Sequence, residues 1–431
     1  MEVLATAEAL SARGAAAPPL SGPAIAVCCA DFGWGSAGKL SAILSALTRD
    51  GSMRTVILGT TLGRPVLSGV RAEAWYEEWP PDTAALRALL DRHGVTAAIV
   101  VLDPDAAESL MAAGIPTIYV DSIPYLWTPA DKLPLQVTAY CAQRSADLPQ
   151  PAAAALDRVA RLFWIEAVVA EPPSRSASSG SLTAILNFGG LHSPVNPGGN
   201  PHYLALVAPA AIQALADAGY EKVEVCGNLG RAELGGLRAD PRISVHVSPR
   251  AHPDFTAALR RADLLLTSPG LTTLLEASAI GIPTLCLPPQ NLSQVFNGAR
   301  FASTFGAECH VSWPGGTLDP ARLDEVRLAG EEAALRYIDV RLSMLDPVSV
   351  YPSMRKAISQ GIRAVHRRDG DWGILAEDAG TSGADQVAAL VRQLATQGEI
   401  PGHATQYDDG AAPRSAAQAV KQPADNGDNS S

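Results

Sequence analysis

The stretch "ADFGWGSAGKLSAIL", residues 30–44, carries glycines and a lysine at a spacing that could bind phosphate. Gly33, Gly38 and Lys39 fit the pattern G-x-x-x-x-G-K of the loops that hold nucleoside triphosphates. The next residue of that pattern is a Ser or Thr whose hydroxyl binds Mg²⁺, and here it is Leu40. The sequence therefore favours a glycine-rich loop that approaches an anion or a sugar over the loop of an ATPase or a kinase.

A second run, "TSPGLTTLLEA" (267–277), predicts a strand end followed directly by a helix start. The first backbone N–H groups of a helix have no partner within it, and with the helix dipole they bind phosphate. Gly270 permits close approach, Thr272 and Thr273 add hydroxyls, and Glu276 is placed to accept from the paired hydroxyls of a ribose. The pattern predicts a nucleoside diphosphate held without a metal; the alternative is a plain helix start with a solvated glutamate.

These two runs belong to a chain in which apolar strands alternate with helices, which predicts parallel sheets covered by helices on both faces. The first half contains strands ending near Asp31, Thr60, Asp103 and Asp121, and the pattern restarts after a low-complexity stretch. We expect an α/β protein with the following parts: a flexible N-terminal segment (1–22), a Rossmann-like domain (23–170), a linker (171–181), a second Rossmann-like domain (182–330), C-terminal helices (331–400) and a disordered tail (401–431). Ligands of such sheets bind beyond the carboxyl ends of the strands, which places the site in a cleft between the two domains.

The composition narrows the classes of function. The chain has 431 residues, a formal net charge of -11 and no basic patch, which argues against nucleic-acid binding. It has no run of 18 apolar residues and no secretory signal, so we expect a cytoplasmic protein that does not bind membranes. The six cysteines form no CxxC pair, which predicts small buried hydrophobic residues in a reducing compartment.

The run from Asp254 to Ala307 resembles the nucleotide-sugar motif of GT-B glycosyltransferases, including the cell-wall N-acetylglucosaminyltransferase that makes lipid II and the UDP-glycosyltransferases. The residues that match this motif are Ala262, Asp263, Ser268, Gly270, Thr273, Glu276, Gly281, Pro283, Gln294, Asn297 and Gly298. Gly298 stands where the family has alanine, so the loop aligns to within a residue. The resemblance implies the GT-B architecture, with two Rossmann-like domains facing a cleft.

The same resemblance implies how a UDP-sugar would be bound, with no metal and no cofactor. The glutamate binds the ribose, the Gly/Thr turn and the loop "NFGG" bind the pyrophosphate, and the loop "PPQNLSQ" contacts the sugar. For the nucleotide and pyrophosphate it implies Gly189, Gly190, Ser268, Gly270, Leu271, Thr272, Thr273 and Glu276, and for the sugar Gln290, Asn291 and Gln294.

The strings "DFGWGSAGKL" and "SPGLTTLLEA…LPPQNLSQVFN" are similar to cytosylglucuronate and hydroxymethylcytosylglucuronate synthases of peptidyl-nucleoside antibiotic pathways. That resemblance implies glucuronate transfer from UDP-glucuronate to N1 of cytosine or 5-hydroxymethylcytosine, with inversion at the sugar carbon. The partners would then be these small molecules, with a homodimer left open.

An inverting transfer needs a base beside the nucleophile and donors for the departing diphosphate. Asp31 is the candidate base, or alternatively an N-cap of the next helix. His192 could donate to the leaving phosphate, or it is a plain loop histidine. Arg64 is the favoured cation for a glucuronate carboxylate, ahead of Arg300 and Lys39. The alternatives are a surface-loop charge for Arg64 and a solvated side chain for Lys39. The first cleft loop and two later residues form the expected acceptor site, namely Gly33, Trp34, Gly35, Asp121 and Tyr125.

Several other functions fit parts of the sequence. A different UDP-sugar transferase, with a natural-product or lipid acceptor, would keep the same motif. A UDP-sugar 2-epimerase would need further carboxylates around the sugar, and a non-catalytic binding subunit would lack the base. The run "AAIVVLD" ending at Asp103 leaves an NTPase as an alternative. The letters "DPD" (103–105) match the acidic motif of metal-dependent GT-A enzymes, but this is weak support in a chain with two Rossmann-like halves.

Overall fold

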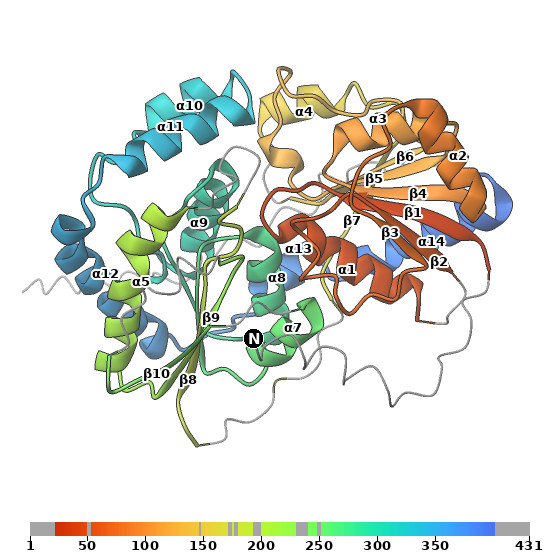
Figure 1. Cartoon of the computed structure of the whole chain (residues 1–431). Coiled ribbons are helices and arrows are strands. Elements are labelled where there is room, and N and C mark those ends of the chain that lie inside the picture. Colours follow the sequence, from red (N-terminus) through yellow and green to blue (C-terminus); the bar gives the residue numbers. More distant parts are fainter. Residues whose placement is uncertain are drawn as a thin grey trace, which may run out of the picture.

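In the computed structural model the chain folds into two parallel β-sheets, each covered by helices (Figure 1). The structure describes residues 22–49, 53–145, 148–170, 175, 180–192, 200–229, 240–247 and 251–400. The expected disordered tail (401–431) lies outside these residues, as do nearly all of the N-terminal segment and most of the linker.

The first sheet has seven parallel strands in the order β3-β2-β1-β4-β5-β6-β7. They are β1 (Ala24–Cys29), β2 (Arg54–Leu58), β3 (Ala74–Tyr76), β4 (Val95–Val101), β5 (Thr117–Asp121), β6 (Ala139–Gln143) and β7 (Leu162–Ile165). The strands predicted before Asp31, Thr60, Asp103 and Asp121 are confirmed as β1, β2, β4 and β5. The strand order reverses between β1 and β4, and an open α/β sheet binds its ligands in the crevice at such a point.

Helices connect these strands, and their starts follow from local sequence. They are α1 (Gly35–Leu47), α2 (Thr83–His93), α3 (Pro104–Ala112), the 3₁₀ turn η1 (Pro124–Leu126) and α4 (Gln150–Leu156). The side chains of Asp82 and Asp103 cap α2 and α3 by accepting from backbone N–H groups three residues on. The last described helix, α14 (Gly383–Gln397), packs on α1, so the C-terminal part of the chain returns to the first domain (Figure 1).

The second sheet has five parallel strands in the order β10-β9-β8-β11-β12. They are β8 (Thr183–Asn187), β9 (Lys222–Cys226), β10 (Ser244–Val247), β11 (Leu264–Thr267) and β12 (Thr284–Cys286). The order reverses between β8 and β11, so the loops after these two strands flank the second crevice.

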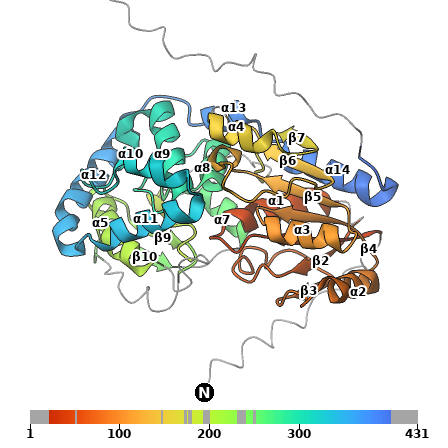
Figure 2. The same cartoon turned by 90° about the horizontal axis from the view of Figure 1, so that it is seen from above.

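The helices of the second half include the one predicted to hold the diphosphate. They are α5 (Pro201–Asp217), α7 (His252–Leu259), α8 (Leu271–Ile280), α9 (Leu292–Phe305), the 3₁₀ turn η2 (Ala307–Cys309), α10 (Pro320–Arg327), α11 (Glu331–Ser343), α12 (Pro347–Arg367) and α13 (Ile374–Ala379). Figure 2 shows α7 and α8 on the side of this half that faces α1. The two crevices therefore open toward each other.

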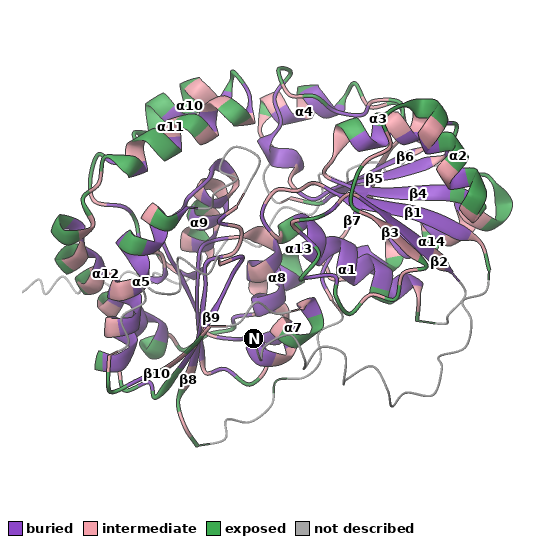
Figure 3. Cartoon of the chain, viewed as in Figure 1, coloured by how far each residue is buried: buried purple, intermediate pink, exposed green. Residues whose placement is uncertain are grey.

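The hydrophobic core lies on both faces of each sheet, as the buried strands and the exposed outer faces of the helices show (Figure 3). All six cysteines are buried and free, as expected of small hydrophobic residues. In the part of the chain that the structure describes, no helix is long and apolar enough to cross a membrane.

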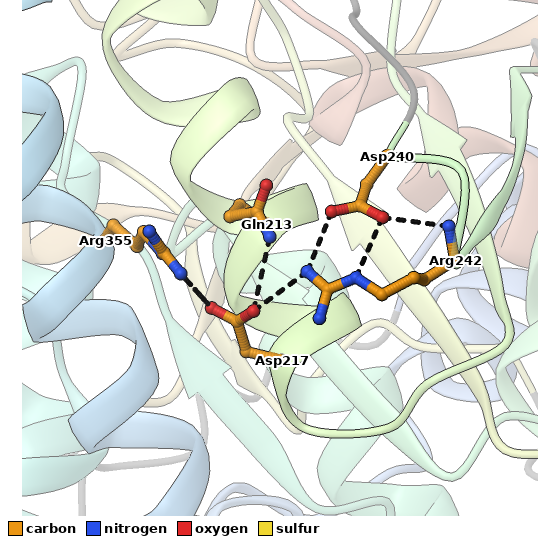
Figure 4. A network of polar contacts seen from close by, with 5 residues as sticks. All are labelled: Gln213, Asp217, Asp240, Arg242 and Arg355. Atoms are coloured by element: carbon orange, nitrogen blue, oxygen red, sulfur yellow. Dashed lines mark hydrogen bonds and ion pairs between the residues drawn. The ribbon is translucent and has the colours of Figure 1, made fainter.

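An exposed ionic network ties α12 to α5 on the outside of the second domain (Figure 4). Asp217, at the end of α5, accepts from Arg355 of α12 and from Arg242 before β10. Asp240 and Gln213 complete the network. Arg242 and Arg355 are about half exposed to solvent and Asp217 is partly exposed, so we expect these ion pairs to add little to stability.

Candidate functional site

The glycine loops of the two domains meet backbone to backbone. Gly33 follows β1 with a φ of +57°, and its N–H donates to the carbonyl oxygen of His192 at 3.0 Å. Gly190 lies opposite, where a Cβ atom would come within 2.2 Å of the Cα of Gly33. Only glycine fits such a contact, so the sequence itself permits the two strand-end loops to close around one cleft.

A cavity of about 520 Å³ lies between the domains at this contact. The sequence-predicted residues that line it are Asp31, Gly33, Trp34, Gly35, Gly189, Gly190, Ser268, Gly270, Leu271, Thr272, Thr273, Glu276, Asn291 and Gln294. The structure thus brings together most of the residues chosen from the sequence, from both domains.

The start of α8 forms one wall of this cavity. Gly270 is the N-cap, no side chain caps the helix, and the first hydrogen bond within it runs from the Leu274 N–H to the Gly270 carbonyl at 3.0 Å. The N–H groups of residues 271–273 precede that bond, so they are oriented to bind an anion. The Asn187 amide donates to the Thr273 hydroxyl at 3.3 Å and so holds the Thr273 side chain in place at this turn.

Glu276 lies deeper in the same wall and is almost fully buried. Its Oε1 accepts from His252 of α7 at 2.5 Å, and His252 is also buried. Burial alone would lower the pKa of His252, but the charge and hydrogen bond of Glu276 raise it above the ordinary value. Glu276 is therefore held in place on one oxygen.

Lys39 is the third charge of this buried group. It comes from α1 of the first domain, and its ammonium donates to Gln143 Oε1 at 3.2 Å and to the Val168 carbonyl at 3.4 Å. Burial lowers its pKa to about 8, although the charge of Glu276 opposes that shift. The expectation that Lys39 lies in solvent is therefore wrong, because α1 faces the interior between the two domains.

Two carboxylates flank the reversal point of the first sheet, one after β1 and one after β4. Asp31 accepts from the N–H and hydroxyl of Thr61 and from the N–H of Leu62, at 3.0–3.2 Å. It does not cap α1, whose N-cap is Trp34, so that alternative is excluded. Asp103 caps α3 and lines the cavity, and burial raises its pKa, with the charges of Asp105 and Asp31 adding to the effect.

Five residues of the expected site do not line the cavity. Arg64 is exposed, pairs with Glu77 and lies over the Trp75 ring, so it is not placed to hold the sugar. Asp121 is fully buried and already accepts hydrogen bonds from Trp127, Tyr140 and the Ile123 N–H. The Tyr125 hydroxyl donates to Asn297 at 2.6 Å, and Gln290 donates to the Phe188 carbonyl at 2.9 Å.

The backbone carbonyl of His192 accepts from the Gly33 N–H, and the role of the His192 side chain stays a prediction.

The structure also adds residues that sequence reasoning missed. His252 and Glu331 line the cavity, and each is the first residue of its helix. In the sequence each is a single ionisable residue outside any motif, so no signal marked it as part of a site. The basic residues among those that line it are Lys39 and His252. In the described part of the chain, no cluster of His, Cys, Asp and Glu side chains could hold a metal ion.

No known protein family matches the sequence, and no curated protein matches it. The fold does match solved structures. A protein from Listeria monocytogenes described as a UDP-N-acetylglucosamine 2-epimerase superposes with a TM-score of 0.51 at 12% identity, covering 89% of this chain and 98% of the other. This chain has the two-domain GT-B fold.

Other GT-B structures superpose less closely. UGT2 of Phytolacca americana gives a TM-score of 0.47 at 12% identity, with 87% of this chain and 99% of the other covered. MurG of Acinetobacter baumannii gives 0.44 at 14%, with 86% and 99% covered. At these identities the likeness does not assign a substrate, and the fold rests on the Listeria structure and on the order of the strands.

The contact between Gly33 and Gly190 gives a direct test of the cleft. We expect Gly190→Ala to force the loops apart, which lowers stability by about 1–3 kcal/mol and weakens UDP binding. Gly69→Ala is the matched control, because nothing lies within 4 Å of the added methyl group. Thermal melting and UDP titration would be compared. If Gly190→Ala matches the control in both, the close approach does not shape the site.

The raised pKa of His252 predicts a pH-dependent contribution to stability. The contribution is fully present below pH 6.5, the ordinary value, and is lost as the pH rises through the raised pKa of the folded state. We therefore expect the loss of unfolding free energy in His252→Gln to be largest at pH 6 and to shrink on the alkaline side. Denaturant titrations at several pH values would measure it, with the exposed His246→Gln as control. A loss that does not change with pH would contradict the ion pair.

Proposed function

We propose that this protein is a metal-independent, inverting glycosyltransferase that moves glucuronate from UDP-glucuronate to N1 of cytosine or 5-hydroxymethylcytosine, in peptidyl-nucleoside antibiotic biosynthesis. One observation carries the general activity: the uncapped start of α8 and the fixed Glu276 share a cavity with the carboxylates Asp31 and Asp103. A donor site and an acceptor site then face each other across one cleft. The sugar and the base rest on the resemblance of the sequence motifs.

The donor half is suited to a nucleoside diphosphate. The N–H groups of residues 271–273 would bind the diphosphate, while the free Oε2 of Glu276 would accept from a ribose hydroxyl. The name of the Listeria protein associates the same fold with a UDP-sugar. Because helix N–H groups stabilise the developing charge of the leaving diphosphate, the transfer needs no metal.

Lys39 takes over the role first expected of Arg64. Lys39 is one of the residues that line the cavity, and the hydrogen-bond partners of its ammonium are neutral oxygens of Gln143 and Val168. A glucuronate carboxylate in the cavity would add an opposite charge and favour the ammonium form. We therefore assign the recognition of the uronate to Lys39.

Asp103 is the better placed base of the two carboxylates. Asp31 already accepts hydrogen bonds from three donors of the loop after β2, so its oxygens are engaged in holding that loop. The pKa of Asp103 is raised by burial, which favours proton uptake. In the reaction the bond from the sugar C1 to the phosphate oxygen breaks, the bond from C1 to N1 forms, and the N1 proton passes to Asp103.

A second candidate is a UDP-sugar 2-epimerase. Asp31, Asp103, Glu331 and the His252–Glu276 pair supply the additional acid and base groups that this reaction requires, and the Listeria protein carries that name. An epimerase exchanges the C2 proton of the sugar and needs no acceptor. Solvent deuterium entering C2 of a UDP-sugar without cytosine would therefore favour this alternative.

A mass-resolved assay tests the transferase directly. Purified protein is incubated with cytosine and a panel of UDP-sugars, with and without EDTA. We expect a product of cytosine plus one uronate from UDP-glucuronate, unaffected by EDTA. If none of the donors gives a product with cytosine, the proposed acceptor is rejected. If UDP also fails to raise the melting temperature of the protein, the donor site is rejected as well.

The assignment of the base predicts different effects of two matched variants. We expect Asp103→Asn to lower kcat by about 10²–10⁴, because the general base is lost. Asp31→Asn should lower stability through the loop after β2 and reduce kcat much less. Turnover by both variants, corrected for the folded fraction, is the measurement. A larger loss of kcat in Asp31→Asn would return the role of base to Asp31.

A further inference from the structure

The acceptor half of the cavity contains a carboxylate from an unexpected part of the chain. Glu331 is the first residue of α11, which follows the second domain in sequence (Figure 1). Its backbone N–H donates to Oδ1 of Asp131, in a loop of the first domain, at 3.1 Å. The other oxygen of Asp131 accepts from the N–H and the hydroxyl of Thr128 at 2.8 Å. Glu331 is thus fixed at the joint between α11 and the first domain.

The side chain of Glu331 has no hydrogen bond or ion pair with the described residues, although it lines the cavity and is partly buried. Burial raises its pKa to about 7, and the nearby charge of Asp131 adds to the shift. A carboxyl group that is withdrawn from water without a protein partner is costly, unless a ligand supplies the partner.

A second polar group in the same cavity is also without a partner. Ser122 directly follows β5, is only 1% exposed, and its Oγ atom forms no hydrogen bond. Trp127 lines the cavity as well, and its indole N–H is already bound to Asp121 at 2.7 Å. The ring of Trp127 can therefore contribute only its apolar surface. A carboxyl and a hydroxyl without protein partners and the apolar surface of an aromatic ring thus line one cavity, which suits a flat polar molecule.

We propose that Glu331 and Ser122 recognise the amino-bearing edge of the acceptor: Glu331 accepts from an exocyclic amino group, and the Ser122 hydroxyl donates to the adjacent ring nitrogen. This inference rests on the proposed function, and on cytosine the two groups are the N4 amino group and N3. The role replaces the one first expected of Asp121, whose carboxylate is fully occupied. The acceptor class is a planar nitrogen heterocycle with an amino group beside a ring nitrogen.

The test compares cytosine with pyrimidin-2-one, which has the same ring and N1–H but lacks the amino group. The wild-type protein should prefer cytosine by roughly ten- to one-hundred-fold in kcat/KM, the range for a ligand that leaves a buried polar group without its hydrogen-bond partner. Glu331→Ala should remove most of that preference, because the group that reads the amino substituent is gone. Glu332→Ala is the matched control, since its exposed side chain pairs with Arg336 outside the cavity.

Ser122→Ala separates recognition from folding. The hydroxyl has no partner in the protein, so its removal should leave the melting temperature unchanged or higher. At the same time the KM for cytosine should rise several-fold. A lower melting temperature with an unchanged KM would show a structural hydroxyl and overturn its role in binding.

The outcomes distinguish this inference from the proposed transfer. If wild-type protein glucuronidates cytosine and Glu331→Ala keeps the full preference over pyrimidin-2-one, the transfer stands and the role of Glu331 is rejected. If no transfer occurs, calorimetric titration of both bases into UDP-saturated protein decides. Tighter binding of cytosine that is lost in Glu331→Ala would uphold the recognition without the reaction. No binding, or binding without preference, would reject it.

Discussion

The close approach of Gly33 and Gly190 is the contact on which the site depends. It brings together the loop after β1 and the loop after β8, each at the point where its sheet reverses strand order. A side chain at Gly190 would hold these loops apart, and the N-terminal end of α8 would no longer face the carboxylates of the first domain. Because both residues are glycines, the loops can approach closely, and the ends of the two sheets line one cavity.

Behind this contact the two domains share a buried cluster of charges. Lys39 comes from α1, while Glu276 and His252 come from α8 and α7. Removing three ionisable groups from water is expensive, and their attraction offsets that loss only when geometry and hydrogen bonding are good. The cluster is therefore better understood as fixing the position of Glu276 for a ligand than as a source of stability. The charge of Glu276 acts on Lys39 from the second domain, while the hydrogen bonds of the Lys39 ammonium stay within the first domain.

Much of this arrangement could be predicted from the sequence, because the strongest signals are local. Apolar runs that end near Asp31, Thr60, Asp103 and Asp121 predicted β1, β2, β4 and β5, and the run 267–277 predicted the end of β11 and the start of α8. The short strand β3 and the strands β6 and β7 were not predicted, because they lack a clear run of apolar residues and depend on their neighbours in the sheet. Burial of Lys39 and the position of Glu331 could not be foreseen, since both follow from packing between segments far apart in sequence. For Arg64 the alternative of a surface-loop charge holds, because this exposed side chain pairs with Glu77 and lies over the ring of Trp75.

In the proposed donor complex UDP lies on the first turn of α8, and hydrogen exchange can detect it there. The N–H groups of residues 271–273 have no partner within the helix, so they should exchange readily in the free protein. Saturating UDP should slow their exchange, whereas uridine, which lacks the phosphates, should not. Protection at these positions by UDP alone would support a diphosphate at the helix start. Bound UDP that leaves their exchange unchanged would contradict it.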